Sequence, residues 1–176
     1  MTQKELRDKL GYVPQKGVLF SGTIDSNIRY GKPEITDAQV KEAAEVAQAT
    51  EFIDTKPEKY ESPVSQGGTN VSGGQKQRLS IARAIAKEPE IFIFDDSFSA
   101  LDFKTDSQLR KALKEYTKDA TTVIVAQRIS TILGADQIIV LDDGHMAGIG
   151  THKELMANCE VYQQIARSQL SEEELA

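Results

Sequence analysis

The chain has 176 residues, with 27 acidic and 21 basic side chains and a net charge of −6. This length supports one sizeable core with a small appendage, but not two full domains. The acidic balance gives no footprint for DNA or RNA, so nucleic-acid binding is disfavoured. The sequence has a single cysteine, no signal peptide and no apolar run near the roughly 20 residues that cross a bilayer, so we expect a soluble chain in the cytosol.

The amino-terminal part begins with a short apolar run and continues into helix-forming sequence. The run at residues 10–13 is followed by Pro14, which predicts a strand that leads into a loop. Thr36, with Gln39 three residues later, matches a capping box. The alanine-rich sequence after this box predicts a helix over residues 36–49.

A loop follows, and then helices and strands alternate. Residues 55–71 are polar and rich in Gly, Pro and Ser, whereas Ser72 can cap a helix that runs to about Lys87. The remaining expected elements are a strand, a helix, two strands and a helical tail, at residues 91–94, 104–116, 121–126, 137–141 and 151–170. This alternation predicts a parallel sheet with right-handed crossovers. The acidic end, residues 171–176, is expected to fray.

Two adjacent carboxylates end the apolar run at residues 91–94. Ligands bind at the carboxyl edge of open α/β sheets, so Asp95 would suit a hard cation such as magnesium and Asp96 could hold a nucleophilic water. For an isolated Asp-Asp pair, the more frequent explanation is a solvated loop opening. The pair alone therefore decides nothing.

A serine and two glycines, in VSGGQ, stand directly before the predicted helix that Ser72 caps. Backbone N–H groups at such an end attract anions, although the pattern alone is more often a flexible cap. In order and spacing, VSGGQ, QRLSIARAI, IFIFDD and SALD resemble the signature, Walker B and D-loop series of an ATP-binding cassette (ABC) nucleotide-binding domain. GYVPQKGVLFSGTIDSNI resembles the Q-loop of the exporter branch of that family, and TTVIVAQRIST resembles its switch loop.

The resemblance implies a fold and a division of the chain. We expect an α/β fold, a partial P-loop ATPase core with a parallel sheet and an α-helical signature subdomain. Residues 1–20 would form the Q-loop strand and loop, and residues 21–88 the helical subdomain with the signature. Residues 89–176 would form the Walker B core and the carboxyl-terminal helices.

The resemblance also assigns roles to single residues. Asp95 would hold magnesium through water, and Gln15 would contact both the metal and the attacking water. The signature would hold the γ-phosphate of ATP bound on an opposite subunit, and the D-loop would lie across the dimer seam. The residues that these two motifs contribute are Ser72, Gly73, Gly74, Gln75, Ser99 and Asp102.

Two positions depart from the family pattern. A glutamate normally polarises the attacking water, whereas this chain has Asp96, one methylene shorter. The switch position is normally histidine and here is Gln127, which can donate a hydrogen bond but carries no positive charge. Misplacing a catalytic group by about 1 Å can cost on the order of 100-fold in rate. We therefore expect the degenerate site of a heterodimeric exporter, whose intact signature would complete the partner's competent site.

No G-x-x-x-x-G-K-[ST] phosphate loop occurs in the sequence, since the Gly31-Lys32 pair is followed by Pro33. In the family this loop and its strand lie upstream of the Q-loop. The chain is therefore expected to be a carboxyl-terminal fragment that binds ATP weakly or not at all. The absent strand would lie between those at 121–126 and 137–141, which predicts unpaired edges and either self-association or a rearranged core.

Two classes of function remain open. The first is the energy-coupling domain of an ABC exporter of the multidrug type, with ATP and Mg²⁺ as ligands. Its partners would be its own transmembrane domain and a second half-transporter, at the cytoplasmic face of the membrane. The second is a truncated, inert fragment that acts as a structural or signature-donating partner. A soluble ABC ATPase acting on DNA or ribosomes is disfavoured by the acidic charge and by LFSGTIDSNI.

Four other side chains have simpler explanations. His145 and His152 lack acidic or cysteine neighbours at metal-ligand spacing and are expected at the surface. Cys159 lies in the predicted tail helix and is expected to pack rather than react. Tyr60 could contact a partner protein or anchor its own loop.

Overall fold

The computed structural model describes residues 1–171, which divide into two compact units, Met1–Val125 and the part from Ala126 onward. The strands of the first unit are β1 (Leu10–Val13), β2 (Gly22–Thr23), β3 (Pro63–Val64), β4 (Ile91–Asp95) and β5 (Thr121–Val125). Its helices are α1 (Gln3–Asp8), α2 (Ile24–Ile28), α3 (Asp37–Val46), α4 (Thr50–Asp54), α5 (Gly73–Ala86) and α6 (Phe103–Tyr116), with short 3₁₀ turns η1 (Lys59–Glu61) and η2 (Gln66–Gly68). Within residues 1–171, no helix is both long and apolar enough to cross a membrane.

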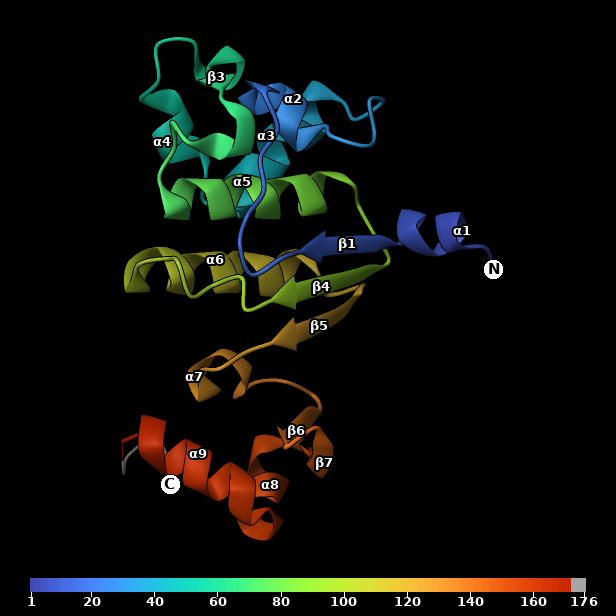
Figure 1. The fold of residues 1–176 in the computed structure, drawn as a ribbon, viewed down its shortest axis with the longest axis vertical. Helices are drawn as coiled ribbons and strands as arrows, with labels where there is room; N and C mark the ends of the chain where they lie inside the picture. Colours follow the sequence, from blue (N-terminus) through green and yellow to red (C-terminus); the bar gives the residue numbers. More distant parts are fainter. Residues whose placement is uncertain (172–176) are drawn as a thin grey trace. The chain divides into compact units, whose positions relative to one another are not determined.

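The predicted parallel sheet is confirmed in the first unit. Its strand order is β1-β4-β5, and the three arrows point the same way in Figure 1. Phe92 and Phe94 of β4 are buried, and they pack in one core with Leu79 of α5 and Leu109 of α6. The carboxyl ends of the three strands therefore meet at one edge, as the sequence predicts.

The capped helices also form where the sequence places them. Thr36 caps α3 through a reciprocal pair of hydrogen bonds with Gln39, and Ser72 caps α5 in the same way with Gln75. The predicted loop over residues 55–71 contains the turns η1 and η2 and the short strand β3, which pairs antiparallel with β2. Tyr60 in this segment is half-buried against the core, which agrees with the loop-anchor explanation.

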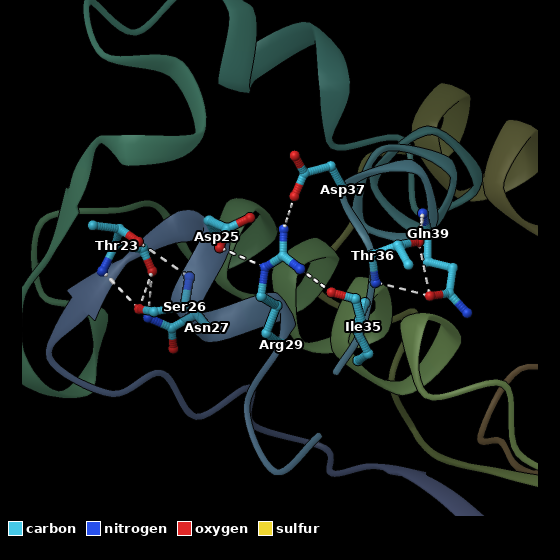
Figure 2. A network of polar contacts seen from close by, with 9 residues as sticks. All are labelled: Thr23, Asp25, Ser26, Asn27, Arg29, Ile35, Thr36, Asp37 and Gln39. Atoms are coloured by element: carbon cyan, nitrogen blue, oxygen red, sulfur yellow. Dashed lines mark hydrogen bonds and ion pairs between the residues drawn. The ribbon is translucent and has the colours of Figure 1, made fainter. Parts of the chain in front are cut away.

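A polar network ties α2 to the start of α3, as Figure 2 shows. The Arg29 guanidinium donates to Asp25 Oδ2 at 2.7 Å and also bonds the Ile35 carbonyl and the Asp37 carboxylate. Its hydrogen bond with Asp25 raises the pKa of Arg29. The network fixes the turn between the two helices through charge-assisted bonds.

In the second unit, β6 (Ile138–Asp142) pairs antiparallel with β7 (His145–Gly150) in a sheet of two strands. Its helices are α7 (Ile129–Ile132), α8 (His152–Asn158) and α9 (Glu160–Gln169). The expected strand at 137–141 is present as β6, and it pairs with β7 because the Asp-Asp-Gly turn folds the chain straight back. The acidic end lies, from residue 172 on, outside the described residues.

The helical tail expected over residues 151–170 is present, but it is divided into two helices. Cys159 has extended backbone angles (φ −122°, ψ 103°) and separates α8 from α9. The break lets both helices bury apolar side chains, Leu155 and Tyr162, in one cluster with the strand β6. Cys159 is itself buried in this cluster, as expected of a packing residue. His152 is half-buried rather than on the surface, because its Nδ1 lies 2.8 Å from Tyr162 Oη.

Candidate functional site

The carboxyl edge of the parallel sheet brings Gln15 to Asp96. Asp95 is the last residue of β4, and the Asp96 N–H donates to the Val125 carbonyl of β5 at 2.9 Å. Gln15 follows β1, and its Nε2 donates to Asp96 Oδ2 at 3.1 Å. Two residues that the sequence places in one site, at a separation of 81 positions, are therefore hydrogen-bonded.

The turn after β4 has an unusual backbone conformation at Asp96. Its φ of 44° lies in the left-handed region, which residues with a Cβ adopt at a cost. Two serine hydroxyls stabilise the turn, because Ser97 Oγ donates to the Val13 carbonyl at 2.9 Å and Ser99 Oγ donates to the Asp96 carbonyl at 3.0 Å. Such strain persists where surrounding contacts impose it, and it is frequent at functional sites.

Asp95 accepts a hydrogen bond from a residue outside the motif assignments. Tyr12 of β1 donates its hydroxyl to Asp95 Oδ2 at 3.1 Å, and this hydrogen bond raises the pKa of the phenol. The strand register explains the contact, because Tyr12 stands opposite Ile93, and Ile93 and Asp95 point to the same face of the sheet. Knowing which residues of β1 and β4 stand opposite each other would have placed Tyr12 beside Asp95.

The signature residues form the amino end of α5. Ser72 Oγ accepts from the Gln75 N–H at 3.2 Å, and Gln75 Oε1 accepts from the Ser72 N–H at 3.1 Å. A Cβ added to Gly73 would meet nothing within 4 Å, and one added to Gly74 would lie at contact distance, 3.4 Å, from the Ala100 carbonyl. Packing therefore requires a glycine at neither position, which leaves accessible backbone that an anion could approach.

The predicted D-loop residues lie beside this helix end. Asp102 caps α6, accepting from the Thr105 N–H at 2.9 Å and from the Thr105 hydroxyl at 2.7 Å. These bonds lower the pKa of the Asp102 carboxyl. Because a Cβ added to Gly74 would lie 3.4 Å from the Ala100 carbonyl, the loop between β4 and α6 adjoins the signature end of α5 within the same unit.

Gln127 belongs to the second unit. It is exposed, and its backbone carbonyl accepts a hydrogen bond from Gln169 Nε2 of α9 at 2.9 Å. The first unit thus brings together Gln15, Asp95, Asp96 and Ser99, whereas the role of Gln127 stays a prediction from the sequence.

The profile of the family described as "ABC transporter" matches residues 1–99. The chain belongs to the ABC transporter family. An uncharacterized ABC transporter ATP-binding protein of Mycobacterium tuberculosis is 46% identical over 169 residues, which cover 94% of this chain and 29% of that protein. A Staphylococcus aureus protein that carries the name of a multidrug export ATP-binding/permease protein is 46% identical over 160 residues, 91% of this chain and 28% of that protein.

A solved structure of a bacterial Atm1-family ABC exporter with ATP bound matches with a TM-score of 0.93 and 40% sequence identity. The match covers 98% of this chain and 30% of that chain. The resemblance to an ABC transporter ATP-binding domain is therefore confirmed, and this chain spans less than a third of the length of these ABC proteins.

The side chains at the sheet edge suit the ligands of an ABC domain. Magnesium keeps several waters and uses one or two carboxylates, and the half-buried Asp95 and Asp96 supply such oxygens. Among residues 1–171, no group of three or more His, Cys, Asp and Glu side chains could form a fuller metal cage. The donor set therefore fits a water-rich magnesium site rather than a closed metal centre.

Proposed function

We propose that this chain is the ATP-binding, energy-coupling part of an ABC exporter of the multidrug type, and that its own nucleotide site is degenerate. The observation that carries the proposal is the 3.1 Å hydrogen bond from Gln15 to Asp96 at the carboxyl edge of the sheet. It supports a role for both residues at one site, at the position where the family carries a longer glutamate. The export function in the name of the Staphylococcus aureus relative supports the transporter class.

Each residue has a defined role in this proposal. Asp95 binds magnesium, which neutralises charge on the phosphates of ATP when it is bound. Gln15 orients the Asp96 carboxylate, and Asp96 holds the attacking water at a greater distance than a glutamate would. Ser72 and Gly73 present the amino end of α5 to the γ-phosphate of ATP on a second subunit.

The proposal predicts an asymmetric assembly. Asp96 and Gln127 both weaken hydrolysis at this subunit's site, since one carboxylate is short and the switch residue carries no charge. The signature is intact and serves the partner's competent site. The partners are a transmembrane domain and a second half-transporter, and the sandwich between the two subunits holds ATP and Mg²⁺.

A second candidate is a catalytically inert chain that acts as a structural or signature-donating partner. It is favoured by one observation, that the 176 residues contain no G-x-x-x-x-G-K-[ST] phosphate loop. In that case, the capped amino end of α5 would be the part of the first unit that contacts nucleotide.

The test measures ATP hydrolysis at this subunit's site in the assembled transporter. Asp96→Glu and Gln127→His should each raise the rate, and together they should raise it by roughly 10- to 100-fold, because they restore reach and charge at one step. Asp119→Glu, the same aspartate-to-glutamate change at an exposed turn, serves as the control. If neither change nor their combination raises hydrolysis, the degenerate-site account is wrong and the inert candidate is favoured.

A further inference from the structure

The loop that carries Gln15 is held by the side-chain amide of Gln77, a residue of α5 that is 2% exposed. Gln77 Nε2 donates to the Pro14 carbonyl at 3.1 Å, and Gln77 Oε1 accepts from the Gly17 N–H at 2.9 Å. One buried amide thus satisfies a backbone acceptor and a backbone donor on either side of Gln15. Leaving either group unpaired in the interior would be costly, so the two bonds act together as a clamp on the loop.

The loop also approaches α5 as closely as its backbone allows. A Cβ added to Gly17 would lie 2.8 Å from Ser80 Oγ and 3.0 Å from the Lys76 carbonyl. Further along the helix, Arg83 Nη1 donates to the Val18 carbonyl at 2.8 Å. Gln77, Ser80 and Arg83 are three residues apart, so they follow one face of α5, and this face holds the loop.

The opposite side of the loop is held by the strand edge. Ser97 Oγ donates to the Val13 carbonyl from the turn that also contains Asp96. The backbone is therefore fixed before and after Gln15, although the Gln15 side chain is exposed. Ordering an exposed glutamine side chain costs conformational entropy, and a fixed backbone lowers what remains to be ordered when the amide bonds Asp96.

We propose that Gln77 is a positioning residue of this site, which holds the loop so that the Gln15 amide reaches the Asp96 carboxylate. Gln77 itself contacts neither carboxylate, and it acts through the loop backbone. Because α5 begins at Ser72, the helix end proposed to face phosphate and the clamp on Gln15 belong to one rigid element. The inference rests on the proposed function for what Gln15 does, but the positioning can be measured without nucleotide.

The test uses nuclear magnetic resonance on the ¹⁵N-labelled full chain without nucleotide. The signals are the exchange rate of the Gly17 amide and the side-chain amide resonances of Gln15. Gln77→Met keeps the unbranched shape and removes both hydrogen-bonding ends. Gln39→Met is the matched control, since Gln39 also bonds through both ends of its amide, to Thr36 and to Glu88.

In Gln77→Met, the Gly17 amide should exchange about 10- to 30-fold faster, and the Gln15 side-chain signals should move to the positions of a free glutamine. Gln39→Met should change neither. If the Gln15 signals keep their positions in a folded Gln77→Met chain, the positioning role of Gln77 is overturned. This result would not depend on whether the degenerate-site proposal is correct.

Gln77→Glu tests the same clamp if Gln77→Met does not fold. In Gln77→Glu, the protonated carboxyl retains one donor and one acceptor, whereas the ionised form has no donor for the Pro14 carbonyl. The Gln15 signals should therefore return toward their original positions as the pH is lowered. If Gln77 had a merely structural role, lowering the pH would not restore the Gln15 signals. Gln15 resonances in Gln77→Glu that do not change with pH would therefore contradict the clamp.

Discussion

At the scale of single residues, two glycines near the site are glycine for different reasons. Gly17 lies against α5, where a Cβ would stand 2.8 Å from Ser80 Oγ. Gly73 begins α5 with open space in the direction of its missing side chain. Packing explains the first glycine but not the second, which the proposed phosphate contact would explain.

This contrast predicts opposite outcomes for two alanine variants. Gly17→Ala should lower the free energy of unfolding by about 1–3 kcal/mol, because the added methyl must push the loop away from the helix. Gly73→Ala should leave it within about 0.5 kcal/mol. Urea unfolding of both variants measures the difference. In the assembled transporter, Gly73→Ala should still reduce hydrolysis at the partner's site. Equal stability losses in the two variants would remove this argument for a phosphate contact.

Some contacts within the candidate site could not be predicted from the sequence. Gln15 and Asp96 are both candidates from motif resemblance, but nothing in the sequence states that they touch. Tyr12 and Gln77 are not predicted as site residues, although both stand inside family motifs. Their roles arise from strand register and from the packing of α5 against a distant loop, which no local pattern encodes.

At the scale of elements, local capping signals made the helices at Thr36 and Ser72 predictable. The same reciprocal bonds cap the short helices α1 and α2, at Thr2 with Glu5 and at Thr23 with Ser26, but helices of 6 and 5 residues are too short for a periodic pattern to predict. The break at Cys159 is different in kind. It depends on packing of its side chain near Gly148 of β7, where an added Cβ would lie 2.8 Å from the sulfur. Only the tertiary structure supplies that constraint.

The cap of α6 predicts a pH dependence. Hydrogen bonds from Thr105 lower the pKa of Asp102 in the folded chain. A carboxyl whose pKa is lower in the folded than in the unfolded state stabilises the fold above its unfolded pKa. That contribution is lost as the pH falls through the folded pKa, that is, below about pH 4. The protection of the Thr105 amide, its exchange rate relative to that of an unstructured amide at the same pH, should therefore decrease in acid.

Two variants of Asp102 separate charge from capping. Asp102→Asn still offers an oxygen to the Thr105 N–H, so the cap should persist and its acid dependence should disappear. Asp102→Ala should speed exchange at every pH. A Thr105 amide in the unsubstituted chain that responds to acid no more than in Asp102→Asn would show that the charge contributes nothing to this cap.

At the scale of the whole molecule, the sheet of the first unit has an open edge. Among the described residues, β5 is hydrogen-bonded to β4 alone, so one row of its backbone groups has no strand partner. Val123 and Val125 are 47% and 53% exposed on this strand. The unpaired edges expected from the sequence are therefore present at β5, and an apolar strand with a free edge favours pairing with another chain.

We accordingly predict that the isolated chain associates with a second copy through β5, with a sedimentation coefficient that rises with concentration. Val123→Lys should shift the equilibrium toward monomer, because a charge on an edge strand opposes strand addition. Gln164→Lys, which adds the same charge on the exposed part of α9, should leave association unchanged. The prediction would be contradicted if the chain sedimented as a monomer at every concentration, or if the two lysine variants associated equally. In either case, the β5 edge would not be the surface through which copies of the chain pair.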